Sequence, residues 1–127
     1  MKRKKSSSFS SLQPQHLKPG KGIRWQKPVI ILTNRSVYSA ANEFVKYMKC
    51  CPKAKIVGDK TGGGAGLPFS SELPNGWSIR FSACPMYDKN KQMTEFGIDP
   101  DYKVDISSSD FSRGRDTIIE FARQLLH

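Results

Sequence analysis

Ser39 is the residue whose position in this sequence best fits a nucleophile. It follows an apolar run over residues 29–32 and opens an amphipathic segment that begins with Ala40. A hydroxyl at such a junction lies at the positive end of a helix dipole, beside backbone N–H groups that have no partner within the helix. Serine at a helix start is also a common N-cap, accepting from a backbone N–H two or three residues later. Both interpretations stay open at this point.

A nucleophilic Ser39 would need a base to take its proton and two donors aimed at an oxyanion. The N–H of Ala40 is a natural first donor, because it comes next along the chain. Ala40 and Ala41 are also small, which leaves room for a substrate carbonyl to approach. Lys60 could act as a desolvated amine base, but nothing around it in the sequence indicates burial. A solvated lysine is the simpler interpretation.

The glycine-rich residues 61–66 include Gly62, Gly63 and Gly64. A phosphate-binding loop would place a lysine after the glycines, whereas Lys60 precedes them, and a dinucleotide fingerprint would need glycine where Leu67 stands. Nucleotide binding is therefore not expected. Two explanations remain: a backbone that passes close to another chain or ligand, which glycine permits by lacking Cβ, and a flexible turn.

Glu95 is the acid that could serve a site, because it directly precedes a turn over residues 96–101 that could aim its carboxylate. Asp99 and Asp101 would cap and rigidify that bend. The alternative is a solvated surface acid, which is the usual state of glutamate.

The elements that would position these residues follow an α/β order. The run over residues 29–32 predicts a strand buried on both faces, as in a parallel sheet. A helix is expected over residues 39–50, a second parallel strand over 55–58, and a hairpin with one apolar face joining 69–73 to 77–83. A short strand over 102–106, a loop over 107–114 and a last helix over 116–126 complete the chain. Within the first helix, the predicted core stripe is Ala41, Phe44, Val45 and Met48.

Charge and composition divide the 127 residues unequally. The net charge is +10, but residues 1–27 hold eight basic residues and no acid, so the remainder carries only +2. Residues 1–24 are rich in Ser, Lys, Gln and Pro, which predicts a disordered basic tail followed by a folded part over 25–127. Nucleic-acid binding through that tail is a weaker hypothesis, which steep salt dependence would reveal. No specific nucleic-acid partner is expected.

Neither an export signal nor a membrane span is recognisable, because residues 6–14 lack an apolar run of the length a signal peptide needs and no stretch of about 18 apolar residues occurs. Three cysteines, Cys50, Cys51 and Cys84, form no C-x-x-C pair and are expected to be free, partly buried thiols. With His16 and His127 near the ends of the chain, no metal site or cofactor is predicted.

Four motifs in register carry a family resemblance: Ser39-Ala40-Ala41 with Glu43 after a hydrophobic strand, residues 56–64, residues 73–77, and residues 95–101. The chain resembles the carboxyl-terminal-processing, or tail-specific, serine protease family from about Trp25 to Leu126. The resemblance implies a crotonase- and Clp-protease-like fold and a polypeptide substrate. It also implies that Ser39 attacks a peptide carbonyl and that the Ala40 N–H forms part of the oxyanion hole.

One branch of that family uses a lysine base in a G-K-G setting, and here the matching place is Gly62-Gly63-Gly64, so the lysine is missing. The tricorn-like branch uses serine, histidine, serine and glutamate, and Glu95 matches its glutamate before a Gly-x-x-Pro-Asp turn. In the family the histidine, the second serine and the other part of the oxyanion hole come from an upstream region, and His16 is a poor substitute.

The chain is therefore expected to be the C-terminal half of a catalytic domain, completed by an upstream part or another chain. Such a piece could be inert alone, or could be a peptide-binding module that has lost its base. Family members usually act in the periplasm or cell envelope, so the localisation stays open.

Overall fold

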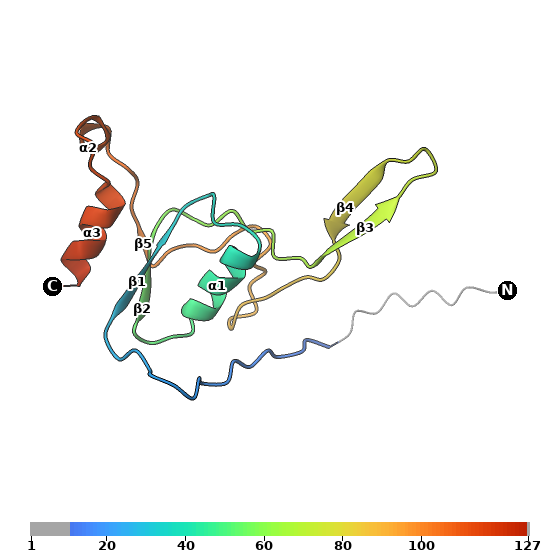
Figure 1. Ribbon diagram of the computed structural model, residues 1–127, viewed down its shortest axis with the longest axis horizontal. Helices are drawn as coiled ribbons and strands as arrows, with labels where there is room; N and C mark the ends of the chain where they lie inside the picture. The colour runs from blue at the N-terminus through green and yellow to red at the C-terminus, as the bar shows by residue number, and fades with distance from the viewer. Residues whose placement is uncertain (1–10, 127) are drawn as a thin grey trace.

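A three-stranded parallel sheet forms the centre of the computed structural model, which describes residues 11–126 (Figure 1). Strand β1 (Val29–Thr33) pairs in parallel with β2 (Ala54–Gly58), and β2 pairs in parallel with β5 (Tyr102–Lys103). Helix α1 (Ala40–Met48) connects β1 to β2. The expected β-α-β unit and the α/β class are confirmed.

The core beneath α1 is small. Val45 of α1 packs against Ile56 of β2 and Ile98, with Ile31, Val37 and Met48 partly buried around them. The apolar stripe predicted for this helix is only partly right, because Phe44 is 52% exposed and Ala41 is exposed, whereas Asn42 and Lys46 are buried beside Val45. The helix therefore turns a partly polar face toward the rest of the protein.

Strand β1 is less covered than its unbroken apolar run predicts. Leu32 is 43% exposed, and within β1 only Thr33 is fully buried. Helix α3 (Thr117–Leu125) contacts β1 and β2 and lies on the other side of the sheet from α1 in Figure 1, but it is too short to cover the whole face. The expectation of a strand buried on both faces is therefore wrong within the described chain.

The hairpin of β3 (Pro68–Glu72) and β4 (Ser78–Ser82) projects from the rest of the molecule like an arm (Figure 1). Gly76, with φ +83°, turns the chain between the strands, and the pairing places Phe69 opposite Phe81 with ring centroids 5.5 Å apart. Every residue of both strands is exposed. The hairpin prediction is confirmed, and its apolar face is uncovered within residues 11–126.

The C-terminal region departs from the expectation in two places. Strand β5 has two residues instead of the predicted five, and residues 108–112, expected in a loop, form helix α2 (Ser108–Ser112). The Ser107 hydroxyl caps α2 by accepting from the Asp110 N–H at 3.1 Å. Asp116 caps α3 by accepting from the N–H groups of Ile118 and Ile119 at 2.8 and 3.2 Å. Local capping explains a helix that apolar periodicity could not reveal.

A buried polar network joins α1 to two loops. Asn42, fully buried, accepts from the Thr61 hydroxyl at 2.6 Å and donates to the Thr94 carbonyl at 3.2 Å. The same Thr61 hydroxyl accepts from the Ile98 N–H at 2.7 Å. Each of these buried polar groups has a partner, so the network holds the start of α1, the glycine-rich segment and the turn after Glu95 in one arrangement.

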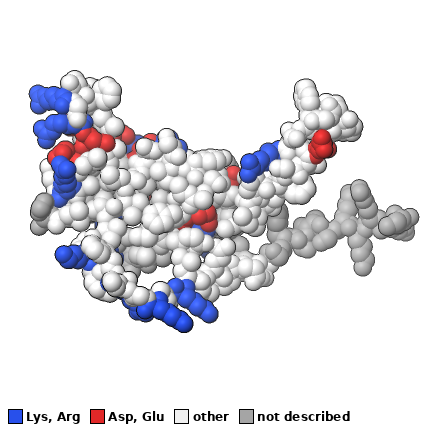
Figure 2. Space-filling model, viewed as in Figure 1, with Lys and Arg blue, Asp and Glu red and all other residues white. Residues whose placement is uncertain are grey.

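Residues 11–28 contain no helix or strand and are all exposed, with Trp25 at 69%. The predicted tail over residues 1–24 lies partly outside the described residues, and its boundary at 24 stays a prediction. Cys50, Cys51 and Cys84 are free as expected but exposed, which corrects their expected partial burial. No helix within residues 11–126 is long and apolar enough to cross a membrane. On the face seen in Figure 2, Lys and Arg gather toward the periphery of the molecule.

Replacing Asn42 tests the buried network. We expect Asn42→Ala to lower the free energy of unfolding by about 1–3 kcal/mol, because it leaves the Thr61 hydroxyl and the Thr94 carbonyl buried without their partner. Urea denaturation followed by circular dichroism measures the loss. Asn90→Ala, at an exposed position, is the matched control. Equal stability of the two variants would show that the network contributes nothing.

Acid should loosen the corner between α2 and α3. The Thr117 hydroxyl, and secondly the Ser107 hydroxyl, hold the pKa of Asp110 below its ordinary value. The folded pKa is depressed, so this contribution is present above the unfolded pKa of Asp110 and is lost as pH falls through the folded pKa. We expect an NMR titration to place the Asp110 midpoint below that of aspartate in a model peptide.

In thermal unfolding between pH 7 and pH 2, Asp110→Asn should flatten part of the acid loss that the unmodified chain shows. Asp105→Asn, at an exposed position, serves as the control. Identical pH curves for Asp110→Asn and the unmodified chain would contradict the assignment.

Candidate active site

Ser39 lies at the junction of β1 and α1 in a strained backbone conformation, with φ +56° and ψ −120°. Non-glycine residues rarely adopt positive φ, and such strain concentrates at functional sites. Its N–H donates to the Gly63 carbonyl at 2.7 Å, which fixes the backbone here. The side chain makes no capping hydrogen bond and is exposed. The plain N-cap interpretation is therefore wrong.

The first N–H groups of α1 differ in whether they have an acceptor. Ala41 N–H donates to the Tyr38 carbonyl at 3.2 Å and Glu43 N–H to the Ser39 carbonyl at 3.0 Å. For the Ala40 N–H, no acceptor occurs among the hydrogen bonds within residues 11–126. An unpaired donor at the positive end of the helix can bind a negative oxygen.

The glycine-rich segment passes between two other pieces of backbone. On one side Gly62 N–H donates to the Val37 carbonyl at 2.8 Å, and a Cβ on Gly64 would lie 2.1 Å from the Tyr38 ring. On the other side a Cβ on Gly63 would lie 2.0 Å from the Glu95 carbonyl oxygen. Gly63 and Gly64 also have φ of +82° and +73°. Close approach, rather than a flexible turn, explains these glycines.

Glu95 lies on the far side of that segment from Ser39. Its carbonyl accepts from Gly64 N–H at 2.8 Å, and its Oε1 accepts from the Ser82 hydroxyl at 2.7 Å. Its Oε2 is buried and has no partner in the described chain. This carboxylate is half-buried and held by a neighbour, so it differs from the solvated acid of the alternative interpretation.

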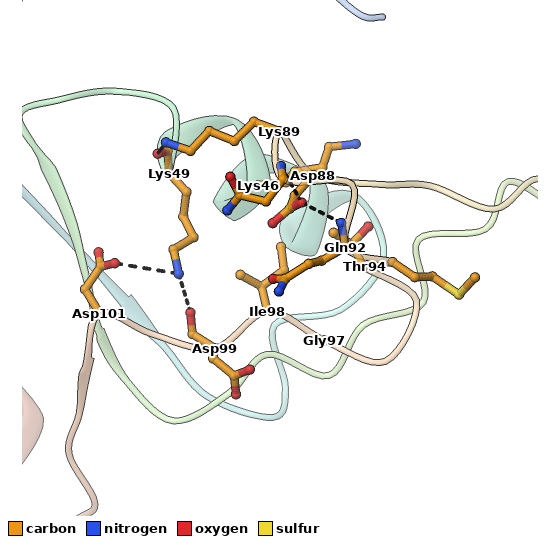
Figure 3. A pocket seen from close by; sticks show the side chains of 12 residues that line it. Lys46, Lys49, Asp88, Lys89, Gln92, Thr94, Gly97, Ile98, Asp99 and Asp101 are labelled. Carbon is orange, nitrogen blue, oxygen red and sulfur yellow. Dashed lines mark hydrogen bonds and ion pairs between the residues drawn. The ribbon is translucent and has the colours of Figure 1, made fainter. Parts of the chain in front are cut away.

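The turn after Glu95 is braced by the aspartates and by α1. Asp101 accepts from the Ile56 N–H at 2.8 Å, and Lys49 contacts both the Asp99 carbonyl at 2.6 Å and the Asp101 carboxylate at 3.6 Å (Figure 3). Gly97 turns the chain with φ +93°. The expected rigidifying role is borne by the Asp101 side chain and the Asp99 backbone.

A cavity of about 340 Å³ opens beside this turn, toward the C-terminal end of α1 (Figure 3). It is lined by charges of both signs, among them Lys46, Lys49, Asp88 and Lys89. Ser39 does not line it, because Ser39 lies at the opposite end of the helix. The cavity is therefore separate from the candidate nucleophile.

Within residues 11–126, no lysine or histidine hydrogen-bonds to the Ser39 side chain as a general base would. Lys60 forms an ion pair with Asp99 at 3.9 Å, and its side chain is 31% exposed. His16, the one histidine within the described range, lies in the exposed segment before β1.

The backbone N–H of Lys60, followed by the Arg35 guanidinium, holds the pKa of nearby Asp59 below its ordinary value. No group of three potential metal ligands occurs among residues 11–126.

Sequence reasoning missed three residues that hold this arrangement together: Asn42, Thr61 and Ser82. For Asn42 the one signal was an asparagine three residues before Val45 in the predicted core stripe, because a buried amide requires partners. Thr61 was seen only as the start of the glycine-rich run. For Ser82 there was no signal, because its contact with Glu95 arises from the way the hairpin folds back.

Comparison with known proteins places this arrangement in a family. A sequence profile of peptidase family S41 matches residues 1–104. A crystal structure of a protein from Parabacteroides merdae, described as a candidate peptidase, is 63% identical and superposes with a TM-score of 0.84 over 87% of this chain. Mature CPAF complexed with lactacystin superposes with a TM-score of 0.71 at 20% identity over 84% of the chain, and the tricorn protease with 0.67 at 22% over 78%.

The chain spans only part of each of these proteins: 35% of the Parabacteroides merdae protein, 21% of CPAF and 10% of the tricorn protease. It likewise spans 20% of a curated relative from Chlamydia muridarum, to which it is 22% identical over 117 residues. The family match extends over well more than half of the chain. The chain belongs to peptidase family S41.

Proposed function

We propose that this chain is a serine-type peptidase domain in which Ser39 attacks the carbonyl of a polypeptide substrate, as expected from the resemblance to tail-specific proteases. The observation that carries the proposal is the strained, exposed Ser39 with a free hydroxyl at the start of α1. A simple cap or a surface serine would not need positive φ, which costs on the order of 1–3 kcal/mol. The strain keeps the hydroxyl outside the helix cap.

The proposed chemistry is an acyl transfer. The Ser39 oxygen forms a bond to the peptide carbonyl carbon, and the carbonyl oxygen becomes an oxyanion that the Ala40 N–H stabilises. A base removes the Ser39 proton and gives it to the amine nitrogen as the intermediate collapses, so the amine leaves and an acyl-enzyme remains. Water then hydrolyses the ester, which releases the carboxylate product and restores the Ser39 hydroxyl. A preorganised donor of this kind is worth about 10²–10³ in rate. Cleavage near the C-termini of substrates is the specificity that the family resemblance suggests.

The site would need a base that residues 11–126 do not place beside Ser39. We propose that an upstream part of the same catalytic domain, or another chain, supplies it together with the second oxyanion donor. Supporting this, the chain spans about a third of the Parabacteroides merdae protein, and large apolar side chains such as Leu32 and Phe44 are half exposed. Another part that packs on β1 and α1 would cover these side chains.

Glu95 would act on that incoming base. Its Oε2 is buried without a donor, and a buried carboxylate oxygen is stabilised when an N–H or O–H reaches it. A histidine arriving beside Ser39 could donate one ring N–H toward Glu95 and keep its other nitrogen free to accept the serine proton. The glycine segment hydrogen-bonds to the backbone of both Ser39 and Glu95, which fixes these two residues relative to one another.

A second candidate function is a peptide-binding module without catalysis. The observation that favours it is the absence of a lysine or histidine contacting Ser39 within residues 11–126. Isothermal titration calorimetry with peptides that have free C-termini, combined with mass spectrometry of the same samples, separates the two. Binding with intact peptides after prolonged incubation supports the module, and product release supports the peptidase.

Covalent labelling tests Ser39 directly. The chain is placed in the Parabacteroides merdae protein in exchange for the matching segment, and the chimera is treated with a fluorophosphonate probe. We expect labelling that Ser39→Ala abolishes and Ser36→Ala, an exposed serine in the preceding loop, leaves unchanged. The unfused chain should label at least about 10²-fold more slowly, because residues 11–126 supply neither a base nor the second oxyanion donor. Labelling that persists in Ser39→Ala would remove this serine from the mechanism.

Neutralising Glu95 tests the acid. We expect Glu95→Gln to lower the kcat of the chimera by about 10²-fold or more while its circular dichroism and melting temperature stay unchanged, because an amide cannot stabilise a charged base. Glu72→Gln on the exposed hairpin is the control. Unchanged turnover in Glu95→Gln would restore the interpretation of Glu95 as an ordinary surface acid.

A further inference from the structure

Ser82 connects the projecting hairpin to Glu95. It is the last residue of β4 and pairs with Pro68, the first residue of β3, so it lies at the base of the arm. Its hydroxyl donates to Glu95 Oε1 at 2.7 Å, across 13 residues of sequence. No other side chain among residues 11–126 donates a hydrogen bond to this carboxylate.

Gly66 packs against both Ser82 and Glu95 and supports the hydrogen bond between them. Its carbonyl accepts from the N–H groups of Ala83 and Cys84 at 2.9 and 3.0 Å, which fixes the chain directly after Ser82. A Cβ on Gly66 would lie 2.3 Å from both Cβ and Oγ of Ser82 and 2.7 Å from Glu95 Oε2. The absence of a side chain at residue 66 is therefore what allows serine and glutamate to meet.

The two oxygens of Glu95 have different surroundings, and this difference makes Ser82 important. Oε1 is held by Ser82, whereas Oε2 is buried without a donor. A carboxylate with one fixed oxygen can rotate only by breaking that bond, so the Ser82 hydroxyl determines where Oε2 points. The orientation of the hairpin and the orientation of the carboxylate are linked through this one hydrogen bond.

We propose that Ser82 is a positioning residue for Glu95, and that the β3–β4 hairpin sets the direction of the Glu95 carboxylate through it. The proposal rests on the proposed peptidase function for its consequence, because the oriented carboxylate is the group that would hold the incoming base. The strands of the hairpin pair only with each other in the described chain. Displacement of the arm therefore pulls directly on the Ser82–Glu95 contact.

The first measurement needs no enzymatic activity. The 127-residue chain is labelled with ¹³C at the glutamate carboxyl carbon, and the Glu95 signal is assigned by its loss in Glu95→Gln. We expect Ser82→Ala to shift the Glu95 signal and leave the Glu72 and Glu120 signals in place. Ser82→Thr should retain the native shift, because it keeps the hydroxyl. Gly66→Ala should shift the signal with Ser82 intact, because its methyl group would separate the pair.

The control is Ser70→Ala, which removes an exposed hydroxyl from the same hairpin and should leave the Glu95 signal unmoved. A Glu95 signal that stays in place in both Ser82→Ala and Gly66→Ala would overturn the proposal. A shift as large in Ser70→Ala as in Ser82→Ala would overturn it as well, since the effect would then be a general one of the hairpin.

The second measurement is turnover in the Parabacteroides merdae chimera. We expect Ser82→Ala to lower kcat about tenfold with KM unchanged, as for loss of one hydrogen bond to a charged group, and Ser82→Thr to restore it. Full kcat in Ser82→Ala would contradict a positioning role. If the chimera does not label at Ser39 but the Glu95 signal still moves in Ser82→Ala, the contact with Glu95 stands and the proposed peptidase function fails.

Discussion

The relative placement of Ser39 and Glu95 depends on the glycine segment between them, which hydrogen-bonds to the backbone on both sides. The Gly63 carbonyl accepts from Ser39, and the next residue, Gly64, donates to the Glu95 carbonyl. These two hydrogen bonds, both under 3 Å, make one chain segment the common reference for two residues that lie 56 positions apart in sequence. Any side chain at Gly63 would collide with the Glu95 backbone, so composition and geometry determine each other here.

The polar network beneath this segment explains why it stays in place. A loop with positive φ at successive glycines loses much conformational entropy on ordering, and backbone bonds alone offset only part of that loss. Thr61, immediately before the glycines, is fully buried and is shared between Asn42 of α1 and the Ile98 N–H. The helix that carries Ser39 and the turn that carries Glu95 are thus tied to the same hydroxyl. The hydrogen bonds of this buried hydroxyl have a fixed direction, so they orient the helix and the turn in a way that apolar packing alone would not.

Much of the fold was readable from the sequence because its signals are local. The apolar run before Ser39, the proline after α1 and the Asn75-Gly76 turn each determine an element through short-range chemistry. Burial was the less predictable part. The apolar run of β1 predicted burial on both faces, and the helical periodicity predicted Phe44 in the core. The burial of each depends on which other elements pack against it, and its own sequence pattern does not determine that.

For the candidate site, too, the sequence indicated some of the residues and not others. Ser39 and Glu95 could be selected because residue type and neighbouring turns indicated them, and the glycines because nucleotide motifs failed to fit. The contact between Ser82 and Glu95 could not be foreseen, since it depends on the path of the hairpin after Leu67, where φ is +42°. Asn42 was visible but not interpretable until its partners in two distant loops were known.

The sheet order β1-β2-β5 has a consequence for handling the protein. Within the described chain, β1 pairs with β2 alone, so one side of a Val-Ile-Ile-Leu-Thr segment presents unsatisfied amide and carbonyl groups to whatever comes near. Exposed edge strands of this composition pair with further strands, including those of identical molecules. Concentrated solutions of the 127-residue chain should therefore self-associate through added β-structure.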